Sequence, residues 1–181
     1  MEINKRNKTG LSSVDKPWLK YYPENIEKLN VPQESMTKLL YDSCQEYLDN
    51  IALSYFNTRK TYRQYIKDIE NYYASLRHMN LKKGEVILTM LPNIPESREL
   101  VYSAVSCNCR VYPLLPMISP AELDRIISEN EVRTIVLFDG FYEKYKSVLE
   151  ANSNLKNIIG TDGTYSLSSV MSFLSKIKNK S

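Results

Sequence analysis

The chain has 181 residues, of which 43% are hydrophobic and 25% charged, and its formal net charge is +3. This ordinary globular composition excludes a disordered tail, a coiled coil and a collagen-like rod. A chain of this length can bury a core without disulfides or bound metal. The excess of basic residues lies in the first 20 and the last 11 residues. It does not form a stripe along the predicted body, so we expect no nucleic-acid partner.

Neither end of the chain shows a membrane or export signal. The N-terminal residues are polar, and no apolar run approaches the roughly 18 residues that a membrane helix requires. The odd number of cysteines, three in all, favours reduced thiols. Together these features predict a cytoplasmic protein without a membrane span.

Residue types that often carry chemistry are scarce. The five glycines form neither a G-x-G-x-x-G nor a P-loop pattern, so we predict no self-sufficient nucleotide site. His78 is the only histidine, and we interpret it as a surface residue near a helix C-terminus. Cys107 and Cys109 stand too close for a C-x-x-C motif and are read as packing residues at a helix-to-strand junction. We therefore assign no catalytic, cofactor-binding or metal-binding residue.

The first third of the chain predicts a lead-in, a helix and a hairpin. Prolines interrupt residues 1–34, which we expect to form an irregular lead-in that packs on the body. Ser35 then suits the N-cap of a helix. A strand is predicted over 51–56 and a turn over 57–60. Thr61 and Gln64 have capping-box spacing, and apolar residues at steps of three and four predict a helix to position 79.

The rest of the chain alternates between apolar strands and helices. Strands are predicted at 85–91, 111–115, 134–138 and 155–159. The intervening helices begin at Pro95, at Pro120 and near Tyr142, and a short helix is predicted at 168–177. Pro113 inside the second of these strands indicates an edge position. The alternation predicts a single α/β domain over residues 35–181, with a mostly parallel sheet and helices on both faces.

Several short segments, in collinear order over residues 15 to 178, resemble one family. They read PWLKYYP at 17–23, IALSYF at 51–56, KTYRQ at 60–64, LKKGEV at 81–86, LPNIPE at 91–96, and PLLP with SPAEL at 113–123. They resemble the N-terminal part of the adenylate-forming (AMP-binding) enzymes, which include acyl-CoA synthetases and adenylation domains. The residues between helix and strand near position 109 depart from the small residues and glycine usual there.

The resemblance implies an ATP-dependent ligase. Such enzymes activate a carboxylic acid as an acyl-adenylate and pass the acyl group to a thiol. ATP, Mg²⁺ and a CoA or carrier-protein thiol are thus implied for the full-length family. The family's glycine-, serine- and threonine-rich phosphate loop and its catalytic lysine are absent from these 181 residues. We therefore expect the chain by itself to be an inactive N-terminal fragment that binds no cofactor.

Two alternatives stay open at this stage. One is a non-catalytic α/β interaction module that docks with a partner chain, and the other is a flavodoxin-like nucleotide-binding domain. If any residues line a substrate rim, we expect Pro92 and Asn93, because open α/β sheets bind ligands at the carboxyl ends of their strands. The expected partner is the remainder of the ligase, in the same or a separate chain, or a second copy through an exposed apolar face.

Overall fold

The fold was analysed in a computed structural model that describes residues 9–23 and 32–164. The chain divides into two compact units, Met1–Glu34 and Ser35–Ser181. The helix predicted at 168–177 lies outside the described residues. In the part of the chain that the structure describes, no helix is both long and apolar enough to cross a bilayer.

The N-terminal unit contains two short helical turns, so its described part is not wholly irregular as predicted. They are α1 (Ser12–Asp15) and the 3₁₀ turn η1 (Pro17–Tyr21). Pro17 does not interrupt a helix but begins one, because a proline at the first helical position loses no hydrogen bond. The Asp15 carboxylate accepts hydrogen bonds from the Thr9 and Gly10 backbone amides at 2.9 Å. The packing of this lead-in on the body stays a prediction.

A helix and a hairpin open the second unit. Helix α2 (Met36–Cys44) begins at the predicted cap, where Ser35 Oγ accepts from the Lys38 amide, and the 3₁₀ turn η3 (Gln45–Tyr47) follows it. Strands β1 (Ile51–Tyr55) and β2 (Thr58–Thr61) form an antiparallel pair. The predicted four-residue turn is too long, since only Phe56 and Asn57 separate the strands. Both have positive φ, +41° and +62°, as a tight two-residue hairpin turn requires.

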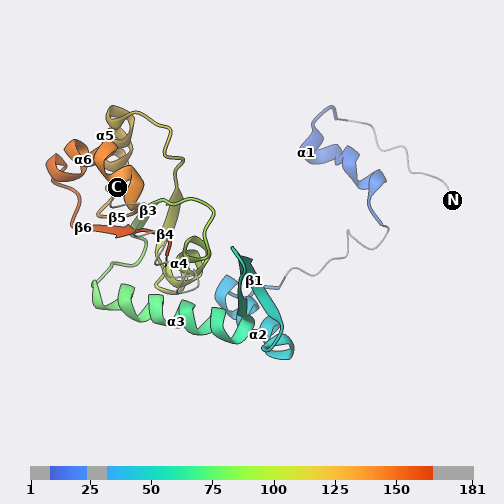
Figure 1. Cartoon of the computed structure of the whole chain (residues 1–181). Coiled ribbons are helices and arrows are strands. Elements are labelled where there is room, and N and C mark those ends of the chain that lie inside the picture. Colours follow the sequence, from blue (N-terminus) through green and yellow to red (C-terminus); the bar gives the residue numbers. More distant parts are fainter. Residues whose placement is uncertain (1–8, 24–31, 165–181) are drawn as a thin grey trace. The chain divides into compact units, whose positions relative to one another are not determined.

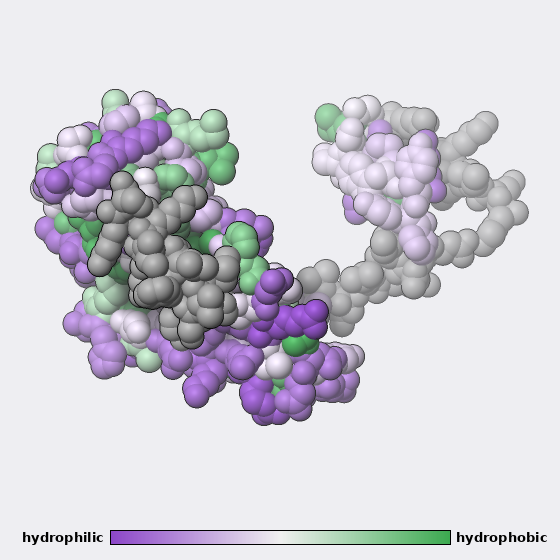
Figure 2. All heavy atoms as spheres, viewed as in Figure 1, coloured by the Kyte–Doolittle hydropathy of each residue, from purple (hydrophilic) through white to green (hydrophobic). Residues whose placement is uncertain are grey.

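Helix α3 (Tyr62–His78) follows the hairpin without a break. Thr61 and Gln64 form the predicted capping box, in which each side chain accepts from the other residue's backbone amide. One face of α3 is buried through Tyr65, Ile66, Ile69 and Leu76. The surface along α3 is mostly hydrophilic in the space-filling view (Figure 2), as expected of an amphipathic helix.

The main sheet has four parallel strands, which confirms the predicted fold class. They are β3 (Val86–Met90), β4 (Arg110–Pro113), β5 (Thr134–Phe138) and β6 (Asn157–Thr161). The order is β4-β3-β5-β6, so the proline-containing strand β4 lies at an edge, as its sequence predicted. The two central strands are nearly continuous apolar runs, typical of strands that are buried on both faces.

Helices cover both faces of this sheet (Figure 1). They are α4 (Pro95–Ser106), α5 (Pro120–Glu129), the 3₁₀ turn η4 (Asp139–Phe141) and α6 (Tyr142–Ala151). The core on one face joins Leu88, Ile135 and Leu137 to residues of α5 and α6. The core on the other face joins Ile87 and Val136 to residues of α3 and α4.

The junction near position 109 is accommodated by an asparagine. Asn108 has φ +57°, a left-handed conformation that asparagine tolerates better than most residues. Its carbonyl accepts a hydrogen bond from the Gly84 amide at 2.8 Å, which ties the junction to the turn before β3. Cys109 is buried and Cys107 half-buried, which confirms the predicted packing role of these thiols.

Candidate functional site

The strand order locates the position in the sheet where a ligand is expected. From β3 the chain crosses over through α4 to β4 on one side, and it then returns through α5 to β5 on the other side. The direction of winding therefore reverses between β3 and β5. Ligands of open α/β sheets bind beyond the carboxyl ends of the strands at such a reversal. Here the loop over 91–94 and the turn η4 leave the sheet at that point.

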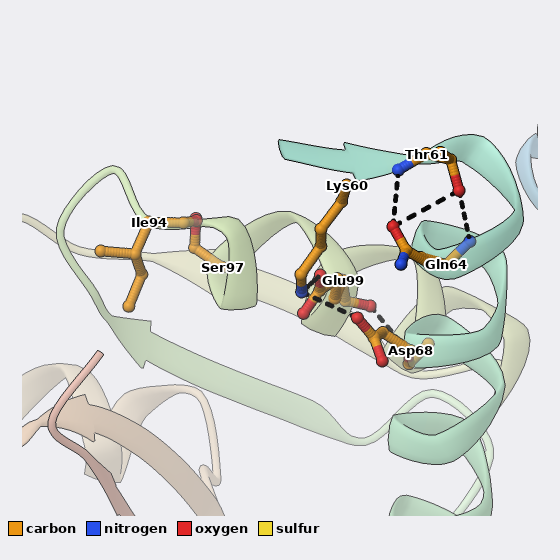
Figure 3. Close-up of polar contacts among 8 residues, drawn as sticks. Lys60, Thr61, Gln64, Asp68, Ile94, Ser97 and Glu99 are labelled. Atoms are coloured by element: carbon orange, nitrogen blue, oxygen red, sulfur yellow. Dashed lines mark hydrogen bonds and ion pairs between the residues drawn. The ribbon is translucent and has the colours of Figure 1, made fainter. Parts of the chain in front are cut away.

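The structure places Pro92 and Asn93 in the first of these loops. Pro92 is half-buried and Asn93 exposed. The Pro92 carbonyl accepts from the Ile94 amide at 2.8 Å, and Asn93 Oδ1 accepts from Arg98 at 3.4 Å. Ile94 then caps α4, and its carbonyl accepts from Ser97 Oγ at 2.6 Å (Figure 3). Contact of Pro92 and Asn93 with a substrate stays a prediction.

Two carboxylates that the sequence reading missed lie at the same edge. Asp139 follows β5, and Asp162 follows β6. Burial raises the pKa of Asp139, and the negative charge of Asp162 raises it further. Asp162 Oδ1 accepts from the amide and the hydroxyl of Thr164 at 2.9 and 2.7 Å. The available signal was that each aspartate directly follows a strand.

Gly160 makes room for one of these carboxylates. A Cβ atom at this position would overlap Asp139 Oδ1, so the glycine allows the Asp139 side chain to lie against β6. The result is an edge that can accept hydrogen bonds from a ligand. The same negative charges would repel a phosphate group unless cations were supplied from elsewhere.

A pocket of about 240 Å³ opens beside this edge, on the sheet face that α3 and α4 cover. Leu76, Met79 and Leu100 line it from the helices, and Val136 and Ile159 line it from the strands. Glu96 also lines it and is only 2% exposed. Glu96 is in the first turn of α4, where the positive end of the helix dipole favours a carboxylate. The pocket is suited to an apolar group.

A buried ion cluster connects the hairpin to helices α3 and α4 (Figure 3). Lys60 Nζ lies 2.6 Å from Glu99 Oε1 and 2.7 Å from Asp68 Oδ2. The Glu99 side chain is fully buried, and its Oε2 atom has no hydrogen-bond partner among the described residues. Burial raises the pKa of Glu99, and Lys60 opposes the rise. These contacts join β2, α3 and α4.

The sequence did not predict this cluster, because Lys60 was expected in a turn and lies instead in β2. One signal was available on α4. Glu96, Glu99 and Leu100 are spaced by three and four residues, so the two glutamates share one face of α4 with a leucine that is expected to be buried. Within the described residues, no group of three or more histidine, cysteine or carboxylate side chains is arranged to hold a metal ion. Because its ion pairs join β2, α3 and α4, we assign the cluster a structural role.

Comparison with known proteins places the fold in context. A family model described as AMP-binding enzyme matches residues 40–176. The long-chain-fatty-acid–CoA ligase of Bacillus subtilis is 28% identical over 130 residues, which are 71% of this chain and 23% of that protein. The 4-coumarate–CoA ligase-like 1 of Arabidopsis thaliana is 25% identical over 124 residues, which are 67% of this chain and 22% of that protein. The chain thus spans about a quarter of the length of the curated relatives it matches.

Solved structures share the fold at low identity. Coronafacic acid ligase from Pectobacterium brasiliense matches with a TM-score of 0.68 and 17% identity, over 76% of this chain and 27% of that chain. The long-chain-fatty-acid-CoA ligase FadD1 from Archaeoglobus fulgidus matches with a TM-score of 0.65 and 19% identity, over 81% and 31% of the two chains. At these identities the likeness shows the fold alone.

Proposed function

Because this chain belongs to the family of AMP-binding enzymes, we propose that it forms the N-terminal part of an acid–thiol ligase. Such a ligase activates a carboxylic acid with ATP as an acyl-adenylate and then forms a thioester. The observation that carries the proposal is the family match, which spans the α/β domain from α2 through β6. The ligase names of the matched relatives support the reaction class.

The carboxyl edge of this chain does not by itself fit a nucleoside triphosphate. The carboxyl edge offers Asp139 and Asp162, which repel phosphate, and the sequence holds no glycine-rich phosphate loop. ATP, Mg²⁺ and the acceptor thiol therefore belong to the proposed whole enzyme. The chain contributes the parallel sheet whose carboxyl edge borders the site. The 181 residues tested alone are inactive under this proposal.

The proposed partner is the remainder of the ligase, in the same chain or in a separate one. The apolar pocket beside the carboxyl edge supports this proposal, because the rest of such an enzyme would cover it. Sedimentation of the 181-residue chain checks the alternative of self-association, which would appear as a dimer that increases with concentration. The free cysteines Cys44, Cys107 and Cys109 support a reducing compartment, and we propose the cytoplasm.

A chimera tests the ligase proposal. Residues 40–164 of this chain replace the matched segment of the Bacillus subtilis ligase, and ATP–pyrophosphate exchange is measured with and without a long-chain fatty acid. We expect acid-dependent exchange from the chimera and none from the 181-residue chain. Thermal unfolding and circular dichroism first establish that the chimera is folded. A folded but inactive chimera would contradict the ligase proposal, and exchange by the chain alone would contradict its inactivity.

The strand order of the main sheet also fits a second candidate, the flavodoxin-like domain. Counted along the chain, the strand order of the main sheet is second-first-third-fourth, which is also how the flavodoxin-like order begins. Strand order therefore does not separate the two candidates. Purification of the chain from a flavin-rich host does separate them, because a flavodoxin-like protein would retain flavin with its visible absorbance. We expect a colourless protein.

A further inference from the structure

The amino ends of three parallel strands meet in a basic cleft, called here the amino-edge cleft. It has a volume of about 270 Å³ and lies where β3, β4 and β5 begin. The loops over 82–85 and 130–133 form its walls. Its charged lining residues are Lys82, Lys83, Glu85, Arg110, Glu131 and Arg133. The cleft is at the opposite edge of the sheet from the candidate site, so neither the proposed function nor the family match accounts for it.

The cleft concentrates positive charge that is not paired with carboxylates of the described residues. Four cationic and two anionic side chains line it. Among the described residues, none of the four cations forms an ion pair with a carboxylate. Elsewhere in the described chain, basic residues do pair, as Lys38 does with Asp42 and Arg125 with Glu122. Positive charges held close together without carboxylate partners repel one another. An anion in the cleft would therefore be stabilised.

Hydrogen bonds already occupy the carboxylate of Glu85. Glu85 Oε2 accepts from the Lys82 amide at 3.1 Å, and Oε1 accepts from Thr134 Oγ1 at 3.3 Å. Thr134 Oγ1 in turn accepts from Asn157 Nδ2 at 3.0 Å. These contacts hold Glu85 against the wall loop and the start of β5. The second carboxylate, Glu131, is exposed in the turn that follows α5.

Hydrogen bonds hold the side chain of Arg110 and the main chain at Arg133. Arg110 Nε donates to the Gly84 carbonyl at 2.9 Å, and the Arg110 amide donates to the Glu85 carbonyl at 2.9 Å. The Arg133 carbonyl accepts from the Lys156 and Asn157 amides at 2.8 and 3.0 Å. Arg133 is also half-buried. The guanidinium of Arg110, which is already held by the Gly84 carbonyl, loses less freedom when it binds an anion than a fully mobile side chain does.

We propose that the amino-edge cleft binds the diphosphate group of a small phosphorylated ligand. Arginine and lysine together form the usual protein site for phosphoryl oxygens. The lining has no aromatic side chain on which a nucleobase could stack. The volume is also below the roughly 300–1,000 Å³ typical of pockets for drug-sized ligands. The cleft therefore recognises the phosphoryl groups, and the rest of the ligand extends into solvent.

Calorimetric titration with inorganic pyrophosphate tests the proposal on the 181-residue chain. The double variant Lys83→Gln/Arg133→Gln removes one cation from each wall of the cleft. The control variant Lys67→Gln/Lys146→Gln makes the same change in net charge at exposed positions on α3 and α6. We expect the cleft variant to weaken binding at least about tenfold, because each lost charge-assisted contact contributes roughly a factor of ten. The control should bind within about twofold of the original chain, since distant charges are screened.

The result can overturn the proposal in two ways. The proposal is wrong if millimolar pyrophosphate produces no heat of binding. It is also wrong if the cleft variant and the control variant weaken pyrophosphate binding equally. Thermal unfolding of each variant shows that the loss does not come from misfolding. If ATP also binds and the cleft variant weakens its binding to the same extent, the ligand is the phosphate chain of a nucleotide. If pyrophosphate binds and ATP does not, the ligand is a free diphosphate. None of these outcomes depends on ligase activity, so this proposal and the proposed function fail separately.

Discussion

Replacement of Lys60 by methionine should destabilise this protein more than any single change on its surface. Lys60 is the cation of the buried cluster, and its side chain is 13% exposed. The side chains of its partners Asp68 and Glu99 are 14% and 0% exposed. Methionine keeps the aliphatic length of the side chain but removes the ammonium. Two carboxylates then stay buried together without that charge.

The expected loss in the free energy of unfolding is about 3–5 kcal/mol, the cost of removing one partner from a buried ion pair. Urea unfolding followed by circular dichroism measures it. The control is Lys38→Met, which breaks the exposed pair with Asp42, where the side chains are 53% and 61% exposed. Such a pair contributes about 0.3–0.5 kcal/mol. The reasoning is refuted if Lys60→Met and Lys38→Met cost the same.

The pH dependence of the Lys60→Met variant provides a second check. Burial raises the pKa of Glu99, and Lys60 opposes that rise in the original protein. Without Lys60, the folded state binds a proton at Glu99 more tightly than the unfolded state does. Stability then falls as the pH rises from the ordinary glutamate pKa through the raised one. The loss in free energy of unfolding caused by Lys60→Met should therefore be smaller at acidic pH than at neutral pH. A loss that does not change with pH would contradict this account.

Three further predictions concern local structure. Thr61→Ala removes the capping-box oxygen of α3 and should lower the free energy of unfolding by about 1 kcal/mol in urea, whereas an unchanged value would show that the cap is dispensable. Asn108 has φ +57°, so Asn108→Gly should leave the melting temperature equal or higher. Asn108→Val should lower the melting temperature, because valine in this conformation is strained by roughly 1–2 kcal/mol. Burial raises the pKa of Cys44, Cys107 and Cys109, the last to about 11. Iodoacetamide at pH 8 should therefore label the native thiols much more slowly than the urea-unfolded ones, and equal rates would contradict their burial.

The sequence by itself determined the helix caps, the buried parallel strands and the fold class. Helix caps such as Ser35 and Thr61 act over three residues, and continuous apolar runs such as the one ending at Met90 are local signals of buried parallel strands. Both signals depend only on residues that are close together in the sequence. The family resemblance also rested on short local segments, and the family match confirms it.

Only the tertiary structure decided which polar side chains meet. Lys60 and Glu99 are 39 residues apart in the chain, and Asp139 meets β6 because strand pairing places Gly160 beside it. Burial of a charge depends on what the other elements cover, and that is a property of packing rather than of local pattern. For the same reason, the amino-edge cleft becomes visible only when three strand starts that are separated in sequence lie side by side.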